Sequence, residues 1–165
     1  MSRIVACFVL SCLLSALWFA PASAADPNPF AGTWVLDAAK SKTDDGPLPK
    51  SEVRTYATNI EGALTIVFEG IEADGMPYAY AATGDINGRE YPVVGRDVGA
   101  RILGDAISWR RIDPLTVEMT IKKKGDVINT TRHAVSQDGK TLTVTENGID
   151  GEGRPVHDTK IYDRQ

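Results

Sequence analysis

The chain has little of the chemistry that covalent, redox or metal-dependent functions require. Two of its 165 residues are cysteine and two are histidine, and both cysteines, Cys7 and Cys12, lie among the first 24 residues. Beyond that segment the chain can form no disulfide, so its stability must come from a hydrophobic core. His133 and His157 have no ligand partner at a motif spacing. We therefore expect neither a metal site nor a cofactor.

Sequence motifs for catalysis and for nucleic-acid binding are also missing. There is no Gly-x-Ser-x-Gly sequence to hold a serine nucleophile, and no cysteine nucleophile remains beyond the N-terminal segment. The formal net charge is −4, and the single basic triplet, Lys122 to Lys124, precedes the turn residues Gly125 and Asp126. Binding to a phosphate backbone draws on clustered lysine and arginine. We expect a protein that is not an enzyme and has no nucleic-acid partner.

The N-terminal segment has the three parts of a secretory signal peptide. Arg3 is followed by an apolar run over residues 4–20 and then by the sequence Pro-Ala-Ser-Ala. A membrane anchor would need about 20 apolar residues and flanks that stop transfer, whereas a proline followed by small residues suits a signal peptidase. We predict that residues 1–24 are a cleaved signal peptide and that residues 25–165 form one domain. The mature protein is then secreted or periplasmic and has no membrane span.

The remainder of the chain consists of short segments separated by turn-forming pairs. Asn-Gly and Asp-Gly pairs tolerate the positive φ angles that two-residue hairpins require. Turn signals occur at Glu61-Gly62, Asp74-Gly75, Asn87-Gly88, Gly104-Asp105, Asp113-Pro114, Gly125-Asp126, Asp138-Gly139 and Gly151 to Gly153. Their spacing predicts strands joined by tight turns in an antiparallel meander.

Between these turns, apolar and polar side chains alternate as strands with one buried face require. Val117, Met119 and Ile121, for example, alternate with polar residues. The segment Leu36 to Ser41 is compatible with a helix, but glycine and prolines follow at once, and we predict a loop or a single turn there. The predicted strands are the one that contains Trp34 and those at 53–60, 64–69, 78–83, 89–94, 107–112, 116–122, 127–135, 141–145 and 156–162.

This number of strands predicts a closed architecture. A large antiparallel meander avoids exposed strand edges most simply by closing on itself. A sandwich of two sheets is the alternative, but no long crossover connection separates the predicted strands. We predict an all-β fold in which an antiparallel up-and-down meander of about 8–10 strands closes into a barrel.

Both ends of the predicted domain resemble the calycins, the superfamily of lipocalins, fatty-acid-binding proteins and avidins. The segment Phe30-Ala31-Gly32-Thr33-Trp34 is similar to their Gly-x-Trp first strand, and Lys160-Ile161-Tyr162 is similar to the Arg-x-Tyr of the last strand of fatty-acid-binding proteins. The second lipocalin motif, Thr-Asp-Tyr, is absent. The resemblance implies a calycin-like barrel of the small secreted bacterial type. It also implies that Gly32 and Trp34 close one end of the barrel, with the indole against a basic residue of the last strand, which here would be Lys160.

A basic and aromatic constellation is the best candidate for a binding site. Trp109 and Arg111 share one face of a predicted strand, and Lys160 and Tyr162 share one face of the last strand. If Trp109 faces the interior, then Arg111, Lys160 and Tyr162 could hold the carboxylate of an otherwise apolar ligand through charge-assisted hydrogen bonds. The alternative is that Arg110 and Arg111 are solvated residues of the rim and that Tyr162 only packs in the core.

These observations lead to two main hypotheses for function. The first is a secreted or periplasmic, lipocalin-like protein that binds a small apolar or amphipathic molecule noncovalently. The second is a packed barrel that acts as a structural or protein-interaction module in the cell envelope. A third, a small barrel enzyme, has no nucleophile or metal motif to support it. A barrel of about eight strands can be filled by side chains while wider ones leave room for a ligand, so strand number and interior residue size distinguish the first two.

Overall fold

The computed structural model describes residues 28–44, 46–96, 104–149 and 155–165. The predicted signal peptide, residues 1–24, and the predicted turn at Gly151 to Gly153 lie outside the described residues. Within the described ranges no helix is present that could cross a lipid bilayer. The strands are β1 (Gly32–Lys42), β2 (Ser51–Thr58), β3 (Leu64–Ile71), β4 (Pro77–Gly84), β5 (Glu90–Arg96), β6 (Ala106–Asp113), β7 (Thr116–Lys123), β8 (Asp126–Val135), β9 (Thr141–Ile149) and β10 (Pro155–Arg164).

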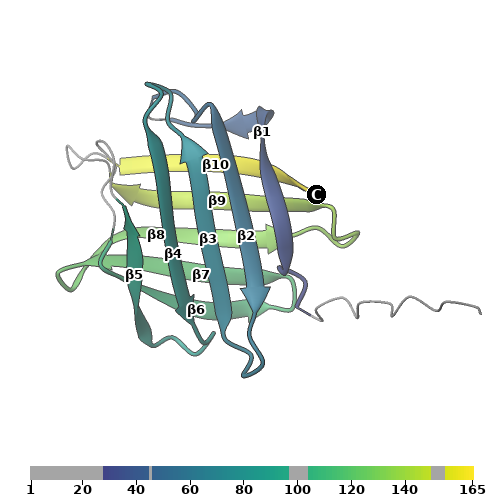
Figure 1. Cartoon of the computed structure of the whole chain (residues 1–165), viewed down its shortest axis with the longest axis vertical. Helices are drawn as coiled ribbons and strands as arrows, with labels where there is room; N and C mark the ends of the chain where they lie inside the picture. Colours follow the sequence, from purple (N-terminus) through teal and green to yellow (C-terminus); the bar gives the residue numbers. More distant parts are fainter. Residues whose placement is uncertain (1–27, 45, 97–103, 150–154) are drawn as a thin grey trace, which may run out of the picture.

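The strands form a closed antiparallel barrel (Figure 1). Each strand pairs with its neighbours in the chain, and β1 pairs with β10, so that Leu36 lies opposite Tyr162. Closure leaves no strand at a free edge, which removes the template for edge-to-edge aggregation. The prediction of an all-β meander closed into a barrel is confirmed, and the two-sheet sandwich is excluded.

Six predicted turns, at Glu61-Gly62, Asp74-Gly75, Asn87-Gly88, Asp113-Pro114, Gly125-Asp126 and Asp138-Gly139, lie at connections between consecutive strands. The turn predicted at Gly104-Asp105 is wrong, because these residues directly precede β6 and the N–H of Asp105 donates to the carbonyl of Lys122 at 2.8 Å. In the turn between β7 and β8, Lys124 and Gly125 both have positive φ angles of 53° and 92°. Two successive positive φ angles define the hairpin turn whose twist matches the strands on either side. Other described glycines with positive φ in connections between consecutive strands are Gly46, Gly62, Gly75, Gly88 and Gly139.

The segment Leu36 to Ser41 is part of β1, and the prediction of a loop or single turn there is wrong. The strand continues to Lys42, with an irregularity in its pairing to β10 after Asp37. The Asp37 carboxylate accepts hydrogen bonds from the backbone N–H groups of Ala39 and Lys40, at 3.0 and 3.2 Å. The Ser41 hydroxyl accepts one from the N–H of Ile161 at 2.9 Å. Side chains thus replace missing ladder bonds at a bulge, and no local sequence pattern encodes this replacement.

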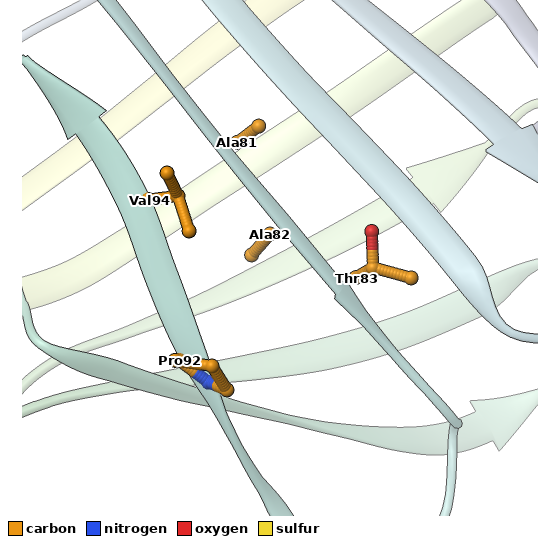
Figure 2. A pocket seen from close by; sticks show the side chains of 5 residues that line it. All are labelled: Ala81, Ala82, Thr83, Pro92 and Val94. Atoms are coloured by element: carbon orange, nitrogen blue, oxygen red, sulfur yellow. The ribbon is translucent and has the colours of Figure 1, made fainter.

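Strand β5 has a short pairing with β6 among the described residues, at Glu90, Tyr91 and Pro92. Proline has no N–H group to donate to the ladder. Between β4 and β5 lies a hollow of about 200 Å³ (Figure 2), which is lined by Ala81, Ala82, Thr83, Pro92 and Val94. Only the threonine offers a polar side chain there, and ligand sites need a few converging polar groups. The hollow is therefore a poor candidate for a binding site.

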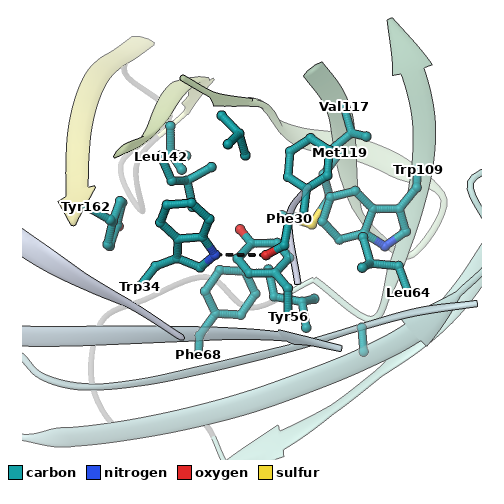
Figure 3. Close-up of a cluster of buried hydrophobic side chains, with 14 of the residues drawn as sticks. Phe30, Trp34, Tyr56, Leu64, Phe68, Trp109, Val117, Met119, Leu142 and Tyr162 are labelled. Carbon is teal, nitrogen blue, oxygen red and sulfur yellow. Dashed lines mark hydrogen bonds between the residues drawn. The ribbon is translucent and has the colours of Figure 1, made fainter. Parts of the chain in front are cut away.

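The hydrophobic core lies inside the barrel (Figure 3), where side chains from strands all around the wall meet. Trp34 and Trp109 are its largest members, and both are completely buried. Leu36, Tyr80 and Ile121 pack against the core and remain partly exposed. The buried cluster consists of Phe30, Trp34, Tyr56, Leu64, Ile66, Phe68, Ala82, Ile107, Trp109, Val117, Met119, Val135, Leu142, Val144 and Tyr162.

Trp34 closes one end of the barrel, which we call the closed end. Its Nε1–H donates to the backbone carbonyl of Phe30 at 2.8 Å, so the buried indole leaves no polar atom unpaired. The cation over its ring is Arg164, with the guanidinium carbon 4.1 Å from the ring centroid. Arg164 also donates to the carbonyl oxygens of Pro29, Ala31 and Gly139, at 2.6, 2.5 and 2.5 Å. This cation therefore holds Pro29 and Ala31, the first strand and the β8–β9 turn together.

The expected partner of Trp34, Lys160, does not occupy this position. In the β1–β10 ladder Trp34 lies opposite Arg164, and Lys160 is four residues away along β10. Gly32 has a φ of 133°, and a Cβ atom added there would lie 2.7 Å from Nη1 of Arg164. Gly32 is therefore required both by its backbone angle and by the space that the guanidinium takes.

Candidate functional site

The interior of the barrel changes in character along its length. Trp34 packs within the apolar core, Arg54 lies opposite it in the β1–β2 ladder, and from there toward the starts of β2 and β10 the interior contains buried charged groups. We call this second half the polar half and define it by the side chains of Glu52, Arg54, Glu146, Asp158 and Lys160. Their alternation with outward-facing neighbours places them on the inner wall. Charged groups are rarely buried unless they are paired, so their partners decide what this half can bind.

Glu52 is the centre of a buried hydrogen-bond network. Its side chain is almost completely buried and accepts from three donors at 2.6 Å: Nε of Arg54 and the hydroxyl groups of Tyr78 and Tyr162. The donors come from three strands, β2, β4 and β10. Charge-assisted bonds of this kind are shorter and stronger than bonds between neutral groups. Glu52 is therefore held as a carboxylate in a fixed orientation.

Arg54 lies between two aromatic rings. Its guanidinium carbon is 4.6 Å from the ring centroid of Phe68 and 4.6 Å from that of Tyr162. Burial opposes its charge, but the Glu52 carboxylate raises the pKa of Arg54 well above its ordinary value. Burial also raises the pKa of Tyr162 well above its ordinary value, so this phenol keeps the proton that it donates to Glu52. The pair and its aromatic neighbours form one preorganised unit.

A second polar group surrounds His133 in the middle of the barrel. The Nδ1 atom of His133 lies 2.6 Å from the Tyr56 hydroxyl, and Nε2 lies 2.7 Å from the Thr131 hydroxyl. Burial lowers the pKa of His133 well below 6.5, and the nearby charge of Arg54 lowers it further. The imidazole is thus neutral, with both ring nitrogens engaged. Trp109 approaches it edge-on, with 5.4 Å between ring centroids.

Lys160 forms a third polar group near the end of the barrel opposite Trp34. Its Nζ lies 3.4 Å from Oε2 of Glu146 and 3.9 Å from Oδ2 of Asp158. Asn129 donates from Nδ2 to the other oxygen of Glu146. Burial raises the pKa of Asp158, and the Glu146 charge adds to this effect against the attraction of Lys160. The group therefore has more negative than positive charge.

The charges of the polar half leave no described cation ready for an anionic ligand. Three carboxylates, of Glu52, Glu146 and Asp158, face two cations, Arg54 and Lys160. Each cation already lies against a carboxylate of the chain. An added ligand carboxylate would have to compete with these partners in a poorly solvated interior.

The structure separates the four residues that the sequence suggested as a ligand site. Trp109, Lys160 and Tyr162 are buried, and the last two share the inner face of β10. Arg111 is exposed near the closed end, where its Nη1 donates to the carbonyl of Pro114 at 3.2 Å. The Tyr162 hydroxyl donates to Glu52 rather than to a group beside Lys160. The predicted carboxylate clamp of Arg111, Lys160 and Tyr162 is therefore not assembled.

Arg110 is also exposed, so both arginines are solvated, as the alternative interpretation predicted. The Nη2 atom of Arg110 lies 2.7 Å from Oε1 of Glu118 on the surface. Strand register decides which of the two arginines shares the face of Trp109, because a shift of one residue exchanges the two faces. The structure settles it by pairing Trp109 with Met119 inside the barrel.

Sequence reasoning missed the Glu52 network and the role of His133. Glu52, Arg54 and Tyr56 are every second residue of β2 and therefore lie on one face of the strand, and Tyr56 is buried in the core. The shared face with Tyr56 could have indicated that Glu52 and Arg54 point inward. A Glu-x-Arg pair is, however, also typical of a solvated strand face. His133 has no ligand motif in the sequence, and in the structure it is packed completely inside the barrel.

No protein-family model and no curated protein matches this chain. Solved structures with a similar fold include the structure titled "a redesigned beta barrel, mFAP1, bound to DFHBI", which is 14% identical, covers 82% of this chain and 95% of that one, and has a TM-score of 0.45. The structure titled "EF1p2_mFAP2b bound to DFHBI" is 13% identical over 83% of this chain and 94% of that one, with a TM-score of 0.48. The "redesigned beta barrel, b11L5F_LGL" is 14% identical over 83% and 92%, with a TM-score of 0.45. These similarities concern the barrel fold alone.

Proposed function

We propose that this protein is a secreted or periplasmic, lipocalin-like barrel that binds a small, uncharged amphipathic molecule noncovalently in its interior. The observation that carries the proposal is that several apolar side chains that pack against the core retain partial exposure. Leu36, Tyr80, Val93 and Ile121 pack against the core and are only partly buried. At the closed end, by contrast, Trp34 is completely buried. We infer that solvent reaches the interior from the end opposite Trp34; Ile86 and Tyr91, near the end of β4 and the start of β5, are partly buried as well.

The wall of the polar half has an apolar and a polar side. Tyr80, Val93 and Ile121 come from β4, β5 and β7, whereas Glu146 and Lys160 come from β9 and β10. Ligand sites in proteins are mostly apolar, with a few polar groups that fix orientation. An amphipathic molecule can place its apolar body against the first side and its polar atoms toward the second.

The buried charges support a binding role better than a purely structural one. Replacing a buried ion pair by apolar residues of similar volume is often neutral or stabilising, so such pairs are weak contributors to stability. Perturbed pKa values and buried charged clusters in a concave site are typical of functional sites. The Glu52–Arg54 pair and the Lys160 group, on the inner wall of one half, have this character.

The charge balance of the interior favours an uncharged ligand over a carboxylate. The cations Arg54 and Lys160 are already paired, and carboxylates outnumber them. This replaces the earlier expectation of a ligand carboxylate held by Arg111.

A packed barrel with a structural or protein-interaction role is the second candidate. It is favoured by the size of the side chains that fill the closed end and the middle, above all Phe30, Trp34, Tyr56 and Trp109, which are buried almost completely. Against it, the structure has ten strands. A barrel of about eight strands is the width that side chains alone fill well, so this barrel has more interior space per layer.

A matched pair of variants tests the proposal. Val93 faces the interior, and its neighbour Val94 faces outward and is 71% exposed. Binding of the neutral dye Nile red and of the anionic dye ANS is followed by fluorescence in the wild type, Val93→Trp and Val94→Trp proteins. We expect Nile red to bind more tightly than ANS, Val93→Trp to weaken binding at least about tenfold by filling the interior, and Val94→Trp to leave it unchanged.

Three outcomes would contradict the proposal. Absence of saturable dye binding would favour the packed barrel, and equal effects of the two valine variants would place the dye outside the interior. Tighter binding of ANS would overturn the assignment of an uncharged ligand. Native mass spectrometry of the protein purified from its own host provides an independent check, since a retained small molecule is expected.

A further inference from the structure

The two buried tryptophans differ in one respect. The Nε1–H of Trp34 donates to the carbonyl of Phe30 at 2.8 Å, whereas Nε1 of Trp109 is buried and has no hydrogen-bond partner among the described residues. Both side chains are fully buried in the barrel interior. A buried donor without an acceptor costs free energy, and such groups in folded proteins need an explanation.

The polar neighbours of Trp109 are already engaged with one another. Trp109 lies opposite Met119 in the β6–β7 ladder, and Met119 lies opposite Thr131 in the β7–β8 ladder, so the three form one row across the inner wall. The Thr131 hydroxyl is bound to Nε2 of His133, and Nδ1 of His133 is bound to the hydroxyl of Tyr56. None of these groups supplies an acceptor to the indole N–H.

Apolar side chains of the core also surround Trp109. In Figure 3, Trp109 lies among the side chains of Leu64, Val117 and Met119, which are all buried. A buried water needs two to four polar partners, and the indole provides one. An acceptor atom that belongs to a mostly apolar molecule fits these surroundings better than a water does.

We propose that the Nε1–H of Trp109 is the hydrogen-bond donor that selects the ligand, and that it binds a neutral carbonyl oxygen on an otherwise apolar molecule. This inference rests on the proposed function and adds the chemical class of the ligand. A neutral ketone satisfies the donor without adding charge to an interior in which Glu52, Glu146 and Asp158 outnumber the cations. A hydrocarbon leaves the donor unpaired, and a carboxylate meets the existing negative charge.

Nuclear magnetic resonance of the indole N–H groups tests the inference in the wild-type protein. The chain has three tryptophans, of which Trp18 lies in the predicted signal peptide, so the exported protein should give two indole signals, from Trp34 and Trp109. The probes are 2-undecanone, undecane and undecanoate, which share an alkyl chain. We expect the ketone to move the Trp109 signal downfield, undecane to leave its hydrogen bonding unchanged, and the Trp34 signal to stay in place because its bond to Phe30 is intact.

Binding competition with Nile red gives the second measurement. We expect 2-undecanone to bind about tenfold more tightly than undecane to the wild type, and this preference to disappear in Trp109→Phe, which keeps a ring and removes the N–H. The Trp34 signal reports whether the variant is folded. If both probes bind equally to the wild type, or if the preference survives in Trp109→Phe, the inference is wrong while the proposed function stands. If none of the probes and no dye bind, the proposed function fails together with the inference.

Discussion

The closed end and the polar half of this barrel are built on different physical principles. At the closed end Trp34 is buried, its N–H is bonded to Phe30, and Arg164 covers its ring and donates to three backbone carbonyls. In the polar half Glu52 and Arg54 are buried as charges, each held by partners from other strands. Apolar burial stabilises a fold directly, while buried charges gain little net stability. The comparison teaches that one half maintains the barrel, and it supports the proposal that the other half takes part in binding a ligand.

The largest effect is expected from removing the indole at the closed end. Trp34→Ala should lower the free energy of unfolding by about 4 kcal/mol, because it deletes a fully buried side chain and leaves a cavity that the barrel wall cannot fill. Urea denaturation followed by circular dichroism measures this change. Ile60→Ala serves as the control, since Ile60 is fully exposed and its loss should change stability by less than about 0.5 kcal/mol. A Trp34→Ala protein as stable as the control would show that this end is not the stabilising half.

The polar half should respond differently to single and paired replacements. Arg54→Met should lower the free energy of unfolding by about 3 kcal/mol, because it leaves the buried Glu52 carboxylate without its cation. The double variant Arg54→Met with Glu52→Gln removes both charges and should recover much of that loss. Denaturation of the two variants under the same conditions gives the comparison. If the double variant is less stable than Arg54→Met by the full cost of a second mutation, the pair is a structural element like the closed end.

The cation at the closed end provides a smaller test. Arg164→Ala should cost about 1–2 kcal/mol, because the guanidinium loses its contact with the Trp34 ring and its bonds to backbone carbonyls. Arg164→Lys should restore only part of this, since an ammonium lacks the planar fork. Arg132→Ala is the control, because Arg132 is 57% exposed and its ion pair with Glu118 at 3.7 Å is a surface pair. Equal stability of the Arg164→Ala and Arg164→Lys variants would show that a cation at this position restores none of the lost stability, contrary to the prediction.

His133, in the middle of the barrel, should affect the free energy of unfolding least at neutral pH and should make it depend on pH in acid. The pKa of His133 in the folded state lies well below 6.5, so the unfolded chain binds a proton that the folded protein excludes. The contribution of the neutral His133 to stability is therefore fully present above pH 6.5. As the pH falls below 6.5, the free energy of unfolding decreases by up to about 1.4 kcal/mol per pH unit. Arg54 strengthens this effect, and Glu52 opposes it.

Matched histidine variants assign this pH dependence. His133→Asn should remove the slope between pH 6.5 and 5.5, whereas His157→Asn should retain it, because His157 is exposed and bound only to Asn147 among the described side chains. Free energies of unfolding at the two pH values measure the difference. A slope that persists in His133→Asn would assign the pH dependence to another group.

The strands and turns could be predicted well because they depend on local properties. Alternation around Val117 and Met119 and positive φ at Gly75 and Gly139 follow from side-chain period and from the lack of a Cβ atom. The failure at Leu36 to Ser41 has a nonlocal cause, since Ser41 completes the β1–β10 ladder by accepting from Ile161.

The candidate site could be predicted only in part. Trp109, Lys160 and Tyr162 were expected inside the barrel and are buried there, but the partners were not foreseen. Lys160 faces Glu146 and Asp158. The basic partner of Trp34 is Arg164, which lies four residues further along β10 on the same face. Which inward-facing residue meets which depends on strand register and on the tilt of strands around the closed barrel.

The sequence by itself determined that this chain is an antiparallel meander with one dry face per strand, because periodicity and turn chemistry act over a few residues. It also determined that residues 25–165 contain no cysteine. Only the tertiary structure decided that Glu52 accepts from Arg54, Tyr78 and Tyr162 and that the donor of Trp109 is left without a partner among the described residues. The contacts of Glu52 with Tyr78 and Tyr162 join strands far apart in the chain, and closure of the barrel fixes them.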